Sequence, residues 1–131
     1  MDINLPEVKA EVEAAFARYE TALVSNDVET LQALFWNSDL TIRYGISEIL
    51  YSYNEIGAFR AARSPVGLAR AISRTVITTY GRDSATASTL FHRETMPGKV
   101  GRQMQTWVRM PEGWRIVAAH VSVIDEPKPI A

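Results

Sequence analysis

Four long β-forming segments fill the second half of the chain, and they constrain its fold more than any other feature. They cover residues 73–81, 84–95, 99–110 and 113–125. The links between them are short and rich in residues that favour turns: Gly81-Arg82-Asp83, Met96-Pro97-Gly98 and Pro111-Glu112-Gly113. Because links this short join neighbouring strands that run in opposite directions, the sequence predicts an antiparallel meander.

The first half of the chain has mainly helical patterns. From residue 7 to residue 24, apolar residues recur every three or four positions, the spacing of one face of an amphipathic helix. Asp27 can cap a second helix over residues 28–35, and Ser52-Tyr53-Asn54-Glu55 matches a capping box for a third over residues 53–63. Residues 39–45 and 47–52 predict a short β-hairpin that turns around Gly45.

This segregation of helices and strands predicts an α+β fold in which a curved antiparallel sheet wraps around the N-terminal helices. A sheet curled around a long helix forms a cone whose mouth is an open pocket. We expect residues 1–125 to form a single domain, because a chain of this length can bury one adequate core. The proline-rich segment 126–131 is expected to be an exposed tail.

The composition excludes several classes of function. The net charge is −1 and the arginines are scattered, so no basic surface for nucleic acid is predicted. No stretch approaches the ~18 apolar residues of a membrane span, and the acidic start of the sequence lacks the apolar core of a secretory signal. With no cysteine, neither disulfides nor thiol nucleophiles can form. We expect a cytoplasmic protein with no nucleic-acid or membrane partner.

The final segment, GWRIVAAHVSVID, places a histidine in a largely apolar strand. Strict alternation divides it into two faces: Trp114, Ile116, Ala118, His120 and Ser122, and Arg115, Val117, Ala119, Val121 and Val123. We assign the first face to the inside of the cone. The second face is also mostly apolar and no further element is left to cover it, so we predict a homodimer through this side of the sheet.

The strongest site candidates are polar residues that would meet inside the cone. His120 would share this space with Gln105 and Trp107 of the preceding strand, either as a proton carrier or as a hydrogen-bonded part of the core. Arg43 lies in mid-strand. It is either the partner of Glu48 across the hairpin or a fork for a substrate carboxylate.

Other candidates also have two interpretations. Tyr19 and Tyr44 are either core residues or ligand contacts. The arginines around the third helix and the first long strand are either solvated or part of the pocket rim: Arg60, Arg63, Arg70 and Arg74. Phosphate-loop, dinucleotide and zinc-protease motifs are absent, so we expect no metal and no cofactor.

The order of elements resembles the nuclear-transport-factor-2-like, or cystatin-like, superfamily, which includes SnoaL-like cyclases. Four motifs narrow the resemblance to its AtzH-like and HpxZ-like group: RYG at 43–45, FRAAR at 59–63, GRQMQTWVR at 101–109 and GWRIVAAHVS at 113–122. The resemblance implies a bacterial role in oxalurate catabolism or cyanuric acid degradation. The site residues it carries over are Arg43, Tyr44, Gln105, Trp107 and His120.

Two functions remain open from the sequence, and the expected ligand is a small anion. In the first, the protein is a decarboxylase or hydrolase of a carboxylated urea or ureide, such as oxalurate or dicarboxyurea. Arg43 would bind a carboxylate, Gln105 and Tyr19 would bind the ureido group, and His120 would move a proton. In the second, the cone is a noncatalytic ureide-binding or accessory protein for a partner amidohydrolase.

Overall fold

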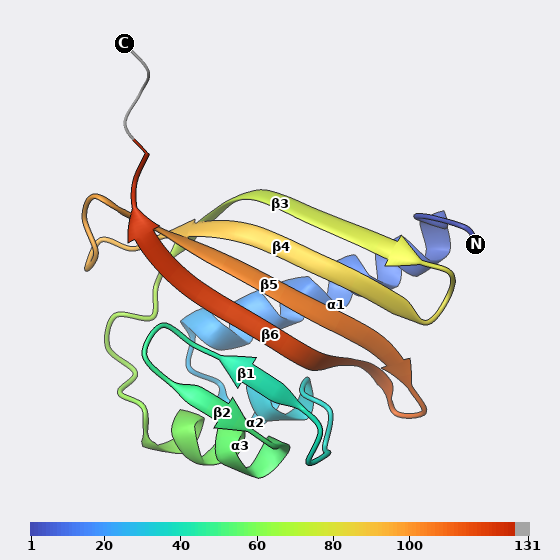
Figure 1. Ribbon diagram of the computed structural model, residues 1–131, viewed down its shortest axis with the longest axis horizontal. Helices are drawn as coiled ribbons and strands as arrows, with labels where there is room; N and C mark the ends of the chain where they lie inside the picture. The colour runs from blue at the N-terminus through green and yellow to red at the C-terminus, as the bar shows by residue number, and fades with distance from the viewer. Residues whose placement is uncertain (128–131) are drawn as a thin grey trace.

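A computed structural model describes residues 1–127 of the chain, which form three helices and a six-stranded sheet (Figure 1). The elements in chain order are α1 (Pro6–Val24), α2 (Val28–Ala33), β1 (Ile42–Tyr44), β2 (Ile49–Tyr51), α3 (Tyr53–Ala62), β3 (Ala71–Tyr80), β4 (Ser84–His92), β5 (Lys99–Met110) and β6 (Gly113–Asp125). The α+β class is confirmed, and the elements lie within a few residues of their expected positions. Of the expected tail, Glu126 and Pro127 are exposed, and residues 128–131 lie outside the described part.

Local sequence signals set the starts of the helices. Pro6 opens α1, where its missing N–H would have no partner within the helix. The Asp27 carboxylate caps α2 by accepting a hydrogen bond from the Thr30 N–H at 3.2 Å. The Ser52 hydroxyl caps α3 in the same way, but Glu55 accepts from the N–H of Tyr51 and not from that of Ser52. The capping box is therefore closed one residue earlier than expected.

The sheet has the strand order β2-β1-β6-β5-β4-β3. Strands β3 to β6 form the expected antiparallel meander, and β1 and β2 form the expected hairpin. The hairpin joins the sheet through β1, which runs parallel to β6. The sheet is thus mixed, and the expectation of an entirely antiparallel sheet is wrong at this one pairing. The free edge of β6 provides the ladder groups that the three-residue strand β1 needs.

Helix α1 crosses one face of the sheet, and the core lies between them (Figure 1). Its buried residues Val8, Val12, Phe16 and Tyr19 pack toward β5 and β6, where Trp107 and Ile116 are fully buried. The opposite face of the sheet is turned toward the viewer in Figure 1, and within residues 1–127 no helix covers it. No helix in the same range is long and apolar enough to span a membrane.

A β-bulge in β6 reverses the expected alternation of its second half. Thr106 pairs with Ala118 but the next residue of β5, Trp107, pairs with Ile116, so Val117 has no opposite residue. An extra residue moves every later side chain to the other face. Val121 is accordingly buried and His120 is exposed. The expectation that Ala118, His120 and Ser122 face the inside of the cone is wrong, although it holds for Trp114 and Ile116 before the bulge.

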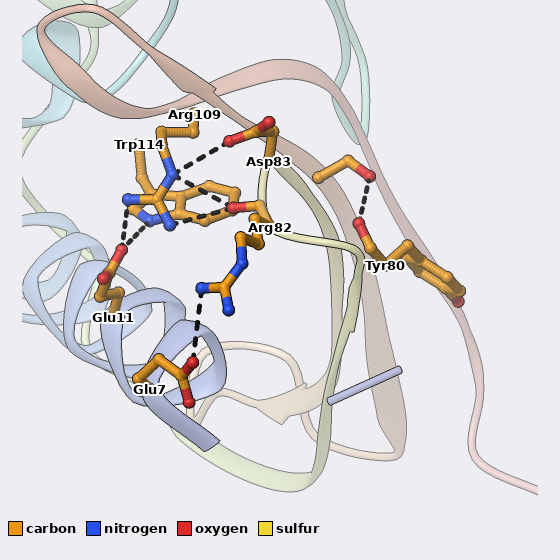
Figure 2. Close-up of polar contacts among 8 residues, drawn as sticks. Glu7, Glu11, Tyr80, Arg82, Asp83, Arg109 and Trp114 are labelled. Carbon is orange, nitrogen blue, oxygen red and sulfur yellow. Dashed lines mark hydrogen bonds and ion pairs between the residues drawn. The ribbon is translucent and has the colours of Figure 1, made fainter. Parts of the chain in front are cut away.

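A polar cluster fastens the first half of α1 to one end of the sheet, as Figure 2 shows. The Glu11 carboxylate accepts hydrogen bonds from Arg109 Nη1 at 2.6 Å and from Trp114 Nε1 at 2.9 Å. The Arg109 guanidinium lies 4.9 Å from the centre of the Trp114 ring, and its Nε donates to Asp83. These contacts join α1, the β3–β4 turn, β5 and β6, and they leave the other end of the cone free to form a cavity.

Candidate functional site

A cavity of about 250 Å³ opens at the end of the cone away from this cluster. Helix α1, the β1–β2 hairpin, α3, the segment after α3 and the inner face of the sheet all contribute to its wall. The lining residues are Tyr19, Leu23, Arg43, Ile46, Ser47, Glu48, Phe59, Arg63, Leu68, Arg70, Arg93, Gln103 and Val121. Four arginines, one glutamine and one tyrosine among these make the wall strongly polar and cationic.

Arg43 points inward from β1 and is paired with Glu48 across the hairpin at 2.7 Å. Burial raises the pKa of the Glu48 carboxyl, but hydrogen bonds from Arg43 and from the Ser47 N–H outweigh it, so the pKa is lowered. Gly45 makes room for this carboxylate, because a Cβ there would lie 1.7 Å from Glu48 Oε1. The Nε of Arg43 still lacks a hydrogen-bond partner. Arg43 therefore pairs with Glu48, as one interpretation of the sequence predicted, and its Nε remains a free hydrogen-bond donor for a ligand.

Arg70 is fixed by neighbours on three sides. Its guanidinium donates two hydrogen bonds to the Glu20 carboxylate, at 2.9 and 2.6 Å, and one to Gln103 Oε1 at 3.0 Å. It also lies 4.6 Å from the centre of the Phe91 ring. With its charge balanced by Glu20, Arg70 forms a rigid part of the wall.

Arg63 and Arg93 differ from these two because, within residues 1–127, neither is paired with a carboxylate. Nε and Nη2 of Arg63 and Nε of Arg93 are buried without a hydrogen-bond partner. Burial and the charges of Arg60 and Arg43 lower the pKa of Arg63 to about 10, and burial and Arg70 lower that of Arg93. The cavity wall thus carries cationic groups and free donors in excess of its carboxylates, the arrangement that suits an anion.

Tyr19 contributes a buried phenol, an acidic group, to the cavity wall. Its hydroxyl accepts a hydrogen bond from Arg60 Nη2 at 3.2 Å. Burial alone raises the pKa of the phenol, but Arg60, Arg43 and Arg70 outweigh burial and lower the pKa to about 8. A phenol in this range can give up a proton near neutral pH far more readily than an ordinary tyrosine, whose pKa is about 10.

The structure brings only two of the expected site residues, Tyr19 and Arg43, to the cavity wall. Gln105 and Trp107 point into the cone but lie in the core, where Trp107 Nε1 donates to Gln105 Oε1 at 3.1 Å. Tyr44 and His120 lie on the outer face, with ring centres 6.2 Å apart. Tyr44 points outward because it alternates with the inward Arg43, and its hydroxyl bonds that of Tyr51.

Gln103 and Arg93 also line the cavity, although neither was among the site residues expected from the sequence. Alternation gave a usable signal for both, since Gln103 shares the inner face with Gln105, and Arg93 continues the inward series of β4 beyond Phe91. Arg63 and Arg70 were expected to be either solvated or at the rim, and they line the cavity. Arg74 is exposed and lies against the outer face.

Helices packed on one face of a curved sheet, with a polar cavity at the open end, define a cystatin-like, nuclear-transport-factor-2-like fold. The fold of an NTF2-like superfamily protein from Salmonella enterica agrees, with a TM-score of 0.72 over 93% of each chain at 24% identity. Within this class the chain belongs to the AtzH-like family, whose model matches residues 1–127.

Two solved structures with higher sequence identity match this chain over nearly its whole length. One, a protein of unknown function from Pectobacterium atrosepticum, is 60% identical, with 95% of this chain and 96% of that chain covered and a TM-score of 0.92. The other, a cystatin-like fold protein from Burkholderia xenovorans, is 50% identical, with 97% and 99% covered and a TM-score of 0.93. A comparison with curated proteins found no match.

Proposed function

We propose that the arginine-lined cavity binds a small carboxylated urea or ureide, such as oxalurate or dicarboxyurea, and that the protein decarboxylates or hydrolyses it. Membership of the AtzH-like family supports a role in bacterial nitrogen catabolism. The cavity volume of about 250 Å³ suits a ligand of this size, and the arginine-rich wall is unsuited to an apolar, steroid-like substrate. The product would be a simpler urea derivative, suited to a cytoplasmic amidohydrolase.

The observation that carries the proposal is the unpaired state of Arg63 and Arg93. Their buried N–H groups point to no acceptor within the described chain, and a cation left unpaired in a partly buried site is destabilising. A carboxylate can accept two parallel hydrogen bonds from one guanidinium and would remove this cost. The free Nε of Arg43 offers a further donor near Tyr19.

Between the two reactions, decarboxylation needs less from these residues. In an N-carboxylated urea such as dicarboxyurea, breaking the bond between a urea nitrogen and its carboxyl carbon leaves the electron pair on nitrogen, releases CO2 and requires one proton at that nitrogen. Oxalurate, whose carboxylate is bonded to a carbonyl carbon, would instead be hydrolysed. Tyr19 is the ionisable group of the wall that can supply the proton, while the arginines hold the ligand. The exposed position of His120 removes it from this proposal.

The test is to mix purified protein with oxalurate, dicarboxyurea and allophanate, and to measure CO2 and ammonia release together with the melting temperature. A ligand at a hundred times its Kd stabilises by about 2.7 kcal/mol. We expect Tyr19→Phe to bind but not turn over, and Arg63→Gln to lose both. Tyr80→Phe and Arg18→Gln are matched controls, because both residues are exposed and lie outside the cavity. Binding without turnover by the wild type would leave a noncatalytic ureide-binding protein.

We also propose that a second copy of the chain covers the outer face of the sheet. Met104 is 55% exposed there and Val76 is 57% exposed, although both lie in long strands with covered inner faces. Strands β3 to β6 contain a single carboxylate, Asp125, at the end of β6. A broad face with exposed apolar side chains and almost no acidic groups is typical of an interface between subunits.

A further inference from the structure

Arg60 of α3 is a buried cation that does not belong to the cavity wall. Its side chain is 1% exposed, and its guanidinium carbon lies 5.1 Å from the centre of the Phe35 ring and 5.8 Å from that of Tyr19. Its one hydrogen bond to another side chain runs from Nη2 to the Tyr19 hydroxyl, at 3.2 Å. Nε and Nη1 have no hydrogen-bond partner, and within residues 1–127 no carboxylate pairs with it.

Burying the Arg60 charge destabilises the folded protein unless another group compensates for the lost hydration. Burying an arginine therefore buries a planar charge with five N–H donors, all of which need acceptors. The two aromatic rings compensate part of the lost hydration, because a cation near the face of a ring is attracted to it. Neither ring supplies a negative charge. Within residues 1–127, the Tyr19 oxygen is the hydrogen-bond partner of Arg60 that can carry a negative charge, once its proton has left.

We propose that Arg60 is a positioning residue, which holds the Tyr19 hydroxyl in place and balances the phenolate that remains when Tyr19 gives its proton to the ligand. The inference rests on the proposed function for the ligand and the reaction, but its claim about Tyr19 concerns the empty protein. Arg60 reaches the cavity only through Tyr19, so it would not contact the ligand itself.

The other charges that face Tyr19 act less directly. Arg43 from β1 and Arg70 from the segment after α3 both favour the phenolate, but each is paired with a carboxylate, Glu48 or Glu20, which cancels part of its field. Arg63 and Arg93 also face Tyr19 across the cavity. Arg60 combines an unbalanced charge with a hydrogen bond, and its charge is the largest influence that lowers the pKa of Tyr19.

The proton transfer balances without any further reactant. The ligand for this step is an N-carboxylated urea such as dicarboxyurea. The O–H bond of Tyr19 breaks as a bond forms between its proton and the urea nitrogen that carries the carboxylate. The bond from that nitrogen to the carboxyl carbon breaks, its electron pair stays on nitrogen, and the carboxylate leaves as CO2. The phenolate accepts the hydrogen bond from Arg60 until a proton from water restores the phenol.

The experiment is a pH titration of tyrosinate absorbance in the protein without ligand. Subtracting the titration of Tyr19→Phe isolates Tyr19 from the four other tyrosines of the chain. We expect Tyr19 to titrate at a pH of about 8 in the wild type. In Arg60→Gln it should titrate at least about one pH unit higher, because the unbalanced charge is gone. Arg60→Lys, which keeps the charge, should titrate between the two, and Arg82→Gln, which is exposed, should match the wild type.

Two results would overturn the inference: an ordinary tyrosine titration for Tyr19 in the wild type, or an unchanged Tyr19 titration in folded Arg60→Gln. If Arg60→Gln fails to fold, Arg60→Lys and the wild type still give a decisive titration. Kinetics separate this inference from the proposed function. Arg60→Gln should lower kcat at least roughly tenfold and leave ligand affinity within a factor of about two, since Arg60 does not touch the ligand. If Tyr19 of the wild type titrates at the expected lowered pH but the protein does not turn over any ligand, the proposed enzymatic activity is refuted and the inference about Arg60 stands.

Discussion

Gly101 of β5 makes room for the aromatic ring that supports two arginines of the cavity, so Gly101→Ala should disturb the fold and the site together. A Cβ at Gly101 would lie 2.1 Å from Cζ of Phe91, its partner in the β4–β5 ladder. Phe91 is fully buried, and the guanidinium carbons of Arg70 and Arg93 lie 4.6 and 5.0 Å from its ring centre. The ring cannot move without displacing one of these groups.

Overpacking of this kind costs about 1–3 kcal/mol. For a chain of this length, 1 kcal/mol lowers Tm by roughly 3–6 °C, so we expect Gly101→Ala to melt roughly 5–15 °C below the wild type. Binding of a small dicarboxylate should also weaken, because Arg70 and Arg93 lose their shared support. Thermal melting, urea unfolding and ligand-induced shifts of Tm measure these effects.

A double-mutant cycle with Phe91→Leu tests the cause. The smaller side chain relieves the overlap, so the double variant should be more stable than the sum of the single effects predicts, by at least about 0.5 kcal/mol. Gly57→Ala is the comparison, because its Cβ would disturb the Gln32 amide and the hydrogen bond of this amide to the Tyr53 carbonyl, and not the Phe91 ring. Additive effects, or a Gly101→Ala variant that melts with the wild type, would refute the proposed contact between Gly101 and the Phe91 ring.

Three further changes test other parts of the molecule. Arg63→Gln should raise the Tm of the protein without ligand. The reason is that burial and neighbouring arginines lower the pKa of Arg63 to about 10, so they disfavour its cationic form at neutral pH. A lower Tm for Arg63→Gln, with the Tm of the control Arg18→Gln unchanged, would contradict this. Glu11→Gln should destabilise at neutral pH, since hydrogen bonds from Trp114 and Arg109 lower the pKa of the Glu11 carboxyl. That stabilisation is complete above the ordinary glutamate pKa and is lost as the pH falls through the lowered one, so urea unfolding of wild type and variant should converge in acid, with Glu13→Gln as the exposed control. Met104→Arg should convert the proposed dimer to monomers in sedimentation velocity, because it adds a cation to a face that already carries Arg102. The control Leu40→Arg, on an exposed loop, should leave the dimer intact. A wild type that sediments as a monomer would refute the interface.

The local elements could be predicted because their signals lie within a few residues of one another. The apolar spacing of α1, the caps Asp27 and Ser52, and the glycine- or proline-containing turns each act through neighbouring backbone groups. The candidate site was harder to predict. Arg43 was identified because a guanidinium lies in mid-strand, and Tyr19 because its phenol lies on the apolar face of the first helix. Arg93 lies in a polar stretch next to a turn, where an arginine is unremarkable.

The assignment of His120 failed for a specific physical reason. Alternation is reliable along a regular strand, but the unpaired Val117 shifts the count by one, and nothing in the local sequence marks it. The bulge lets Trp114 and Ile116 pack against the helices on one side of it and Val121 line the cavity on the other. The parallel pairing of β1 with β6 is equally invisible locally, since it joins segments more than seventy residues apart.

The sequence by itself determined which segments become helices and strands, where they turn and that the helices must cover one side of a sheet, because these depend on short-range backbone preferences and on the period of apolar residues. Only the tertiary structure decided which face His120 occupies and which arginines meet. Arg43 comes from β1, Arg63 and Arg70 from the segment between α3 and β3, and Arg93 from just after β4, and the fold brings these three segments to one cavity. In the empty protein these four positive charges repel one another, so the site favours an anion. This property arises only when folding brings the four side chains together.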